Sequence, residues 1–190
     1  MQTEPISLKR QTGDGLEDPS LAENFCKGET GAFEQIIKQY YKPVHRLASR
    51  LLSWSDEAED VVQDVFVSVL ANQKKFRGQS SLKTWIFRIT VNACRQWKYR
   101  QMLRFKWLSS QSKLPPVNVE SEPDKIDHEP VRKAVQKLPV KYRQVIVLKY
   151  LNELPTKQIC EVLNIKEQTF HTCLSRARQI LKEKLNEIEL

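Results

Sequence analysis

Several protein classes are excluded by what this 190-residue sequence lacks. It contains only five glycines, which is few for an all-β protein built around many tight turns. No apolar run approaches the ~20 residues that a membrane-spanning helix requires, and residues 1–20 show no apolar core of a signal peptide. We therefore expect a folded, cytoplasmic protein without membrane insertion.

The cysteines show no pattern of a metal site or a disulfide framework. Cys26, Cys94, Cys160 and Cys173 lie far apart and never form a Cys-x-x-Cys pair. Structural zinc sites need closer or more regular spacing. His171, two residues from Cys173, would point to a different side of a helix. We expect reduced thiols, and we expect no metal, no cofactor and no catalytic residue.

Acidic residues are missing from a long central segment. Residues 65–119 contain no aspartate or glutamate but eleven lysines and arginines, with aromatic residues among them. Cations neutralise phosphates, and exposed aromatic rings stack on unpaired bases for ~1–3 kcal/mol each. Together with a net charge of +8, this acid-free segment predicts contact with nucleic acid. The alternative is an aromatic core beneath a solvated cationic face, and Trp85 fits partial burial.

Acids instead gather immediately before the acid-free segment. Five acidic residues lie between positions 56 and 64, and no lysine or arginine occurs from Ser53 to Asn72. This acidic cluster suits either an ordinary solvated helix face or a face that docks on a basic protein surface. Composition alone leaves both interpretations open.

Apolar spacing predicts an all-α protein of two small helical domains joined by a flexible linker. Residues 1–20 are expected to form a mobile tail, residues 21–108 a first domain and residues 129–190 a second. Three prolines and little periodicity mark residues 109–128 as the linker. Within the first domain, Pro43 predicts a kink or a division of its helix. Ser80 or Ser81 is expected to cap a later helix that runs through Trp97.

The second domain has the layout of a helix-turn-helix motif. A short helix after Pro155 and a longer helix through residues 165–181 flank Asn164, which tolerates the left-handed turn conformation. Polar residues would lie opposite the apolar side of the longer helix. There, amides and hydroxyls can read base edges, and cations can hold phosphates. The alternative is a helical hairpin that packs against protein.

Three sequence blocks, in this order, resemble the extracytoplasmic-function (ECF) group of sigma factors in the sigma-70 family. Asp56–Phe66 resembles the part of region 2 that docks on core RNA polymerase, and Phe76–Asn92 resembles its promoter-melting and −10-binding part. Leu138-Pro139, Tyr142-Arg143 and Arg176-Ala177-Arg178 are similar to region 4, whose helix-turn-helix binds the −35 element. The resemblance implies a non-enzymatic factor that binds core RNA polymerase and promoter DNA, with an anti-sigma factor as regulatory partner.

The resemblance assigns functional residues to three surfaces. Core polymerase is expected to contact Asp56, Glu59, Asp60, Gln63, Asp64 and Phe66. The −10 DNA is expected to contact Phe76, Arg77, Gln79, Ser80, Lys83, Thr84, Trp85, Arg88, Asn92, Arg95 and Tyr99. The −35 DNA is expected to contact Lys166, Gln168, Thr169, His171, Thr172, Ser175, Arg176 and Arg178. His171 and Cys173 replace cations that are customary in the family, which predicts an unusual or weaker −35 preference.

Two other functions fit parts of the sequence. A stand-alone helix-turn-helix transcriptional regulator would explain residues 155–181, but it leaves the acidic cluster and the acid-free segment without a joint role. A nucleic-acid-processing enzyme would need clustered carboxylates for metal ions or an activated nucleophile. Asp60 and Asp64 lie one helical turn apart but have no histidine near them in the sequence. A sigma factor is therefore the favoured prediction.

Overall fold

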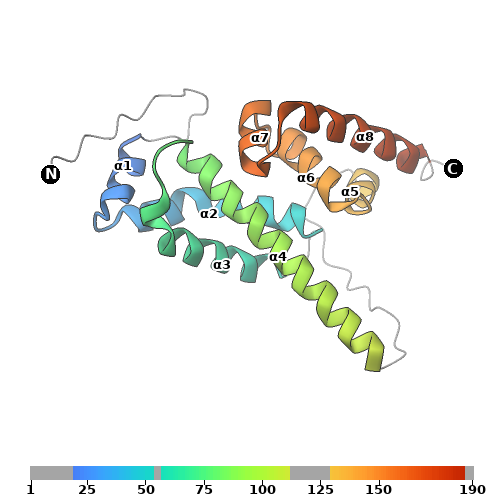
Figure 1. Ribbon diagram of the computed structural model, residues 1–190, viewed down its shortest axis with the longest axis horizontal. Coiled ribbons are helices and arrows are strands. Elements are labelled where there is room, and N and C mark those ends of the chain that lie inside the picture. The colour runs from blue at the N-terminus through green and yellow to red at the C-terminus, as the bar shows by residue number, and fades with distance from the viewer. Residues whose placement is uncertain (1–18, 54–56, 112–128, 187–190) are drawn as a thin grey trace.

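The computed structural model describes residues 19–53, 57–111 and 129–186. Over these residues the chain forms helices and no strand, and the helices group into two packed bundles (Figure 1). The predicted all-α fold with two domains is confirmed. The described residues up to 111 are called the first domain below, and residues 129–186 the second domain.

The described part of the first domain is built from helices whose apolar faces share one core. They are α1 (Pro19–Lys27), α2 (Ala32–Leu51), α3 (Ala58–Ala71), the short 3-10 helix η1 (Gln73–Lys75) and α4 (Leu82–Gln111). Ile36, Leu47, Val62, Val65 and Ile86 are completely buried. Burial of one aliphatic side chain stabilises the fold by ~1.5–3 kcal/mol. This packing fixes α3 and α4, which carry the predicted polymerase and −10 contacts.

Helix boundaries depart from the predictions at three places. α1 begins at Pro19, inside the predicted tail, and α4 continues to Gln111, inside the predicted linker. The end of α4 is rich in good helix formers and contains no glycine or proline, so local preference extends the helix. α2 is one helix through Pro43, so of the two predicted outcomes, a kink or a division, the division is wrong. Buried Tyr40, Val44 and Leu47 on either side of this proline offset its cost of ~3 kcal/mol.

A side chain defines the start of α4. The Thr84 backbone N–H donates to Ser81 Oγ at 3.1 Å, and the Trp85 backbone N–H donates to Ser81 O at 3.0 Å. Ser81 is therefore the N-cap residue, which confirms one of the two predicted positions. Because an N-cap fixes where the first turn begins, it also fixes which α4 residues share a face.

The second domain contains the predicted helix-turn-helix. Its described elements are α5 (Glu129–Gln136), α6 (Val140–Ile146), a turn of π-helix named η2 (Val147–Leu151), α7 (Thr156–Leu163) and α8 (Glu167–Asn186). Asn164 separates α7 from α8 with φ 53° and ψ 53°, the left-handed conformation expected of it. Phe170, Leu174 and Ala177 are buried on the inner side of α8. The opposite side of α8 is thereby turned outward.

The two domains pack against each other. α7 lies over the N-terminal half of α4, and α6 and η2 contact α2 (Figure 1). Buried apolar residues of both domains belong to one continuous cluster. This contact involves Arg88 and Arg95, two of the predicted DNA-binding side chains.

Candidate polymerase and nucleic-acid interfaces

The outer side of α3 combines acidic and apolar side chains. Asp60, Gln63 and Asp64 are exposed. Val67 and Leu70 continue the same side and expose 68% and 48% of their surface. Neither Val67 nor Leu70 was predicted as a contact from the sequence. Their helical spacing from Asp60 is the signal that could have placed them on this side of α3. Large exposed apolar side chains next to polar ones are typical of protein-binding surfaces.

The other predicted polymerase contacts anchor α3 on α2. Both carboxylate oxygens of Glu59 accept the Tyr41 hydroxyl, at 2.9 and 2.8 Å, and this hydrogen bond raises the pKa of Tyr41. Phe66 is buried, and its ring stacks on that of Tyr41 with 6.4 Å between the centroids. Asp56 lies outside the described residues. Glu59 and Phe66 therefore hold α3 in place on α2, and they lie next to the exposed side of α3.

The loop between η1 and α4 is held against α1. The Phe76 ring is buried and lies 5.1 Å from the Trp85 ring, centroid to centroid. Cys26 Sγ donates to Phe76 O at 3.5 Å, and Gln73 Nε2 donates to Phe25 O. These contacts connect the loop to α1, an element that the sequence resemblance did not assign to any surface.

The predicted −10 contacts divide into a buried and an exposed set. Phe76, Lys83 and Thr84 are buried, so in this structure they support the loop and the start of α4. The Thr84 hydroxyl accepts from Ser81 Oγ at 2.9 Å, which ties it to the N-cap. The exposed or partly exposed set comprises Arg77, Gln79, Ser80, Trp85, Arg88, Asn92, Arg95 and Tyr99. This exposed set, called the −10 surface below, runs from the loop along α4.

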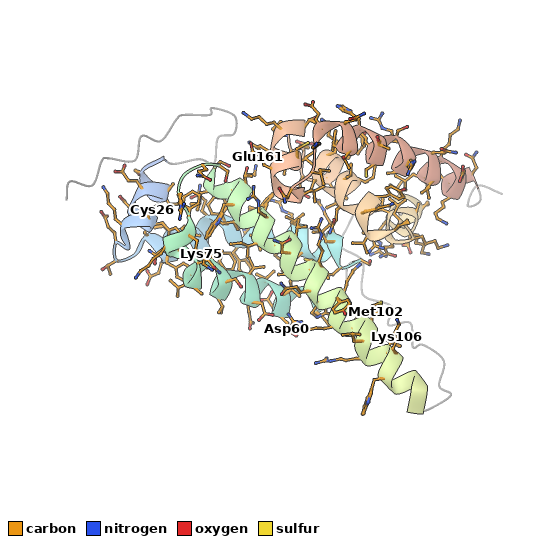
Figure 2. All side chains as sticks on the ribbon, viewed as in Figure 1. Cys26, Asp60, Lys75, Met102, Lys106 and Glu161 are labelled. Atoms are coloured by element: carbon orange, nitrogen blue, oxygen red, sulfur yellow. The ribbon has the colours of Figure 1, made fainter. Side chains whose placement is uncertain are left out.

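Two cations of the −10 surface are bonded to the second domain. Arg88 Nε donates to Glu161 O at 3.0 Å, and Arg95 Nη2 donates to Gln144 Oε1 at 2.7 Å. Figure 2 shows Glu161, on α7, close to the beginning of α4. The sequence did not indicate this contact, because the partners are 73 and 49 positions apart.

A small pocket lies where α2, α4 and α6 meet. It is lined by Leu51, Cys94, Arg95, Lys98, Val140, Arg143 and Gln144. The described lining residues include three cations and no carboxylate. Burial, and then the Arg143 guanidinium, lower the pKa of Lys98 to about 8. Burial also lowers the pKa of Arg95 and of Arg143. The pocket therefore disfavours positive charge at the boundary between the domains.

The last turns of α4 project beyond the bundle and expose large side chains (Figure 1). Tyr99, Met102, Leu103, Phe105 and Trp107 expose between 45% and 62% of their surface. Figure 2 labels Met102 and Lys106 on this projecting part. Only Tyr99 of this group was predicted as a contact. The sequence signal that could have identified the other four residues is the acid-free composition, which continues well past Tyr99.

α8 presents the predicted −35 contacts to solvent. Lys166, Gln168, Thr169, His171, Thr172, Ser175, Arg176 and Arg178 are all exposed. Arg178 Nε donates to Tyr150 Oη at 2.8 Å, and a hydrogen bond with Arg176 is the largest cause that lowers the pKa of Tyr142. His171 Nε2 lies 3.6 Å from Glu167 Oε1. This outward side therefore carries the Glu167 carboxylate beside its cations and hydroxyls, and Glu183, which accepts from Gln179 at 3.2 Å, adds a second carboxylate four residues further on.

The described residues contain no group of three or more His, Cys, Asp or Glu side chains placed to hold a metal ion. Within the same residues, no helix has the length and apolar character needed to cross a membrane. The four cysteines are free thiols, and burial raises the pKa of Cys94 to about 12.

Comparison with known proteins places both domains in one family. Residues 36–103 match the family model for Sigma-70 region 2, and residues 128–181 match the model for Sigma-70, region 4. The chain is 31% identical over 174 residues to the ECF RNA polymerase sigma factor SigW of Bacillus subtilis. That alignment covers 85% of this chain and 93% of SigW.

Solved structures share the fold. The sigma factor RpoE of Bartonella quintana, in complex with the anti-sigma factor NepR, is 27% identical with a TM-score of 0.67, over 83% of this chain and 98% of that one. CnrH, in complex with the cytosolic domain of CnrY, is 23% identical with a TM-score of 0.66, over 90% and 97%. The chain therefore belongs to the ECF group of the sigma-70 family: it is an RNA polymerase sigma factor, a non-enzymatic protein that directs transcription initiation.

Proposed function

We propose that this sigma factor distributes its contacts over three surfaces. The outer side of α3 binds core polymerase, the −10 surface binds the opened promoter strand, and α8 binds the −35 element. The segregation of charge carries the proposal, because exposed Asp60 and Asp64 lie on α3 whereas α4 has seven lysines and arginines and no acidic residue. A polyanion is repelled by the first surface and attracted by the second. Residues 21–108 then act as region 2 and residues 129–190 as region 4.

The side of α3 suits a protein partner with a positive rim. Interfaces combine an apolar centre with polar surroundings, and Val67 and Leu70 beside Asp60, Gln63 and Asp64 supply both. The acids would attract a basic surface of the polymerase, which speeds association and sets the orientation of docking. The Glu59–Tyr41 hydrogen bonds keep α3 in place while it docks.

The −10 surface suits a single strand. Arg77 and Gln79 are exposed in the loop, and Arg95 and Tyr99 are exposed further along α4. Arginines hold phosphates, and the exposed Tyr99 ring can stack only on a base that has left the duplex. Because Phe76 is buried, we expect an unpaired base to meet the polar side chains of the loop rather than the Phe76 ring.

The outward side of α8 suits duplex DNA, but a carboxylate on this side reduces its electrostatic attraction to the phosphates. Gln168 and Thr172 can reach base edges, and Lys166 and Arg176 can reach phosphates. The Thr172 hydroxyl already donates to Gln168 O at 2.9 Å, which orients it. Glu167, beside His171, adds a negative charge on the same side. We therefore expect −35 binding to be weak and to depend on the holoenzyme.

An anti-sigma factor is the regulatory partner that we propose, and the cytoplasm is the proposed location. The similar sigma factor of Bartonella quintana was solved with the anti-sigma factor NepR. When no polymerase is bound, Val67 and Leu70 leave apolar surface exposed, and a partner protein that buries this surface would be stabilised by it. Core RNA polymerase works in the bacterial cytoplasm, so a factor that binds it must be present there.

Transcription in vitro with purified core polymerase tests the proposed function. The wild-type chain is expected to form a holoenzyme and to initiate at promoters mapped after its induced expression. Asp64→Arg is expected to weaken core binding about tenfold or more, because reversed charge at an interface costs several kcal/mol. Glu34→Arg makes the same charge change at an exposed residue of α2 and is the matched control. A wild-type chain that neither binds core nor initiates would reject the proposal.

A further inference from the structure

Two arginines of α8 lie at opposite edges of its contact with α6. α8 packs on α6 (Figure 1), and Ala177 is completely buried. Arg176 and Arg178 precede and follow Ala177, and both are exposed. Because successive residues of a helix are rotated by about 100°, the two arginines leave α8 on the two sides of its buried face. A helix in the major groove has one phosphate backbone on each side, so each arginine would stand near a different backbone.

Tyr150 of η2 holds Arg178 through its hydroxyl. Arg178 Nε donates to Tyr150 Oη at 2.8 Å, and Nη2 of the same guanidinium also donates to this oxygen. Arg178 Cζ lies 5.6 Å from the centroid of the Tyr150 ring. Among the described residues, these bonds use one edge of the guanidinium only. The Nη1 N–H groups are therefore left for an acceptor outside the chain.

Tyr150 reaches α8 from a turn of π-helix. The Asn152 backbone N–H donates to Val147 O, five residues back, at 2.9 Å, and Tyr150 lies inside this turn. A π turn takes more residues than an α turn, so it changes the direction in which its side chains point. Val147 and Leu148 are completely buried and anchor the turn, whereas Tyr150 exposes 45% of its surface. The turn thus places a phenol at the surface beside Arg178.

Tyr142 of α6 makes the corresponding contact with Arg176. A hydrogen bond with Arg176 is the largest cause that lowers the pKa of Tyr142, and a hydrogen bond with Lys141 is the next. Lys141 Nζ also lies 4.7 Å from the centroid of the Tyr142 ring. Tyr142 exposes only 9% of its surface, so packing fixes the ring and its hydroxyl gives the arginine a fixed partner. Each of the two arginines is therefore held by one tyrosine of the preceding helices.

We propose that Tyr142 and Tyr150 are positioning residues of the −35 site, which hold Arg176 and Arg178 ready for the phosphate backbones on the two sides of α8. This inference rests on the proposed −35 function of α8 and deepens it. An arginine loses rotamer freedom when it is fixed on a phosphate, and an arginine that is already held loses less. Because the tyrosines are neutral, they orient the cations without the competing charge of a carboxylate. Neither tyrosine was among the predicted −35 contacts.

Tyr150→Phe tests the inference, because it removes the hydroxyl and keeps the ring. Fluorescence anisotropy of the full chain with a −35 duplex at low salt is expected to show about fivefold weaker binding. The slope of log affinity against log salt is expected to become shallower, as it does by about 1 for Arg178→Ala, because an arginine that is not held makes its phosphate contact in fewer complexes. A merely structural loss would lower the amount of active chain and leave this slope unchanged. The midpoint of urea unfolding is expected to stay the same.

Tyr41→Phe is the matched control. Tyr41 is a similarly exposed tyrosine whose hydroxyl is bonded to Glu59 in the first domain, and its loss is expected to change duplex binding less than about twofold. In the Arg178→Ala background, Tyr150→Phe is expected to have no further effect, because a positioning residue acts through its arginine. A loss that persists in this background would make Tyr150 a direct DNA contact and overturn the inference. A Tyr150→Phe chain that binds like the Tyr41→Phe chain would overturn it as well.

Tyr142→Phe and Arg176→Ala form a second cycle of the same design. Tyr142→Phe is expected to weaken duplex binding about threefold, and to have no effect once Arg176 is alanine. If the wild-type chain binds the −35 duplex no better than a scrambled duplex, the proposed −35 function of α8 fails and the inference fails with it. If the wild type distinguishes the two duplexes but both phenylalanine variants bind like the wild type, only the positioning role fails.

Discussion

Raising the pH from 7 to 9 is expected to close the two domains of the free chain. In the closed structure, burial and then the Arg143 guanidinium lower the pKa of Lys98 to about 8. When the domains separate, this pKa returns toward its ordinary 10.5. The closed state therefore binds fewer protons above pH 8, and closure gains stability as the pH rises from 8 toward 10.5. Below pH 8, Lys98 is charged in both states and this gain is absent.

The two pKa values set the size of the effect. With about 8 for the closed state and 10.5 for the open one, the equilibrium constant for closure rises about tenfold between pH 7 and pH 9. Lys98 is partly exposed and part of its burial comes from α4 itself, so solvent screening and the retained burial reduce the expected change to about fivefold. The neighbouring Cys94 has a pKa of about 12 and stays neutral in this range. The facing Arg95 and Arg143 stay charged.

Energy transfer between one dye on each domain, measured at pH 7, 8 and 9 without DNA, follows closure directly. Lys98→Met keeps a similar side-chain length without a charge, and is expected to be closed at every pH and to show no pH dependence. Dyes placed on two helices of the first domain serve as the control for dye effects. A wild-type chain that opens as the pH rises would refute the reasoning. So would a Lys98→Met chain that keeps the dependence.

Three further outcomes are expected. Ser81→Ala removes the N-cap of α4 and is expected to cost about 1 kcal/mol in urea unfolding; Ser80→Ala is the control, and equal losses would contradict the cap. Phe170→Ala empties a site that is 1% exposed and is expected to cost about 3–5 kcal/mol; thermal unfolding that stays unchanged would show that α8 does not depend on it. His171→Arg adds a cation on the outward side of α8, so the slope of log affinity for −35 duplex against log salt should steepen by about 1; an unchanged slope would place residue 171 away from phosphate.

Much of the local structure could be predicted from the sequence, because it depends on residues within a turn or two. The cap at Ser81 and the left-handed turn at Asn164 needed only their neighbours. The acidic cluster and the acid-free segment are contiguous, so their opposite charges could be read directly and matched to two blocks of one family. Pro43 is the counter-example: its local preference divides a helix, and packing on both sides of it keeps α2 whole.

The sequence by itself determined the helical fold class, which side of each long helix is apolar, and the separation of charge between α3 and α4. Tertiary structure alone decided which predicted DNA contacts are accessible. Thr84 and Arg95 lie on the same side of α4 by helical spacing, yet Thr84 is buried and Arg95 reaches Gln144 in the other domain. The physical reason is that periodicity tells which side of a helix a residue occupies, whereas burial depends on what distant segment covers that side.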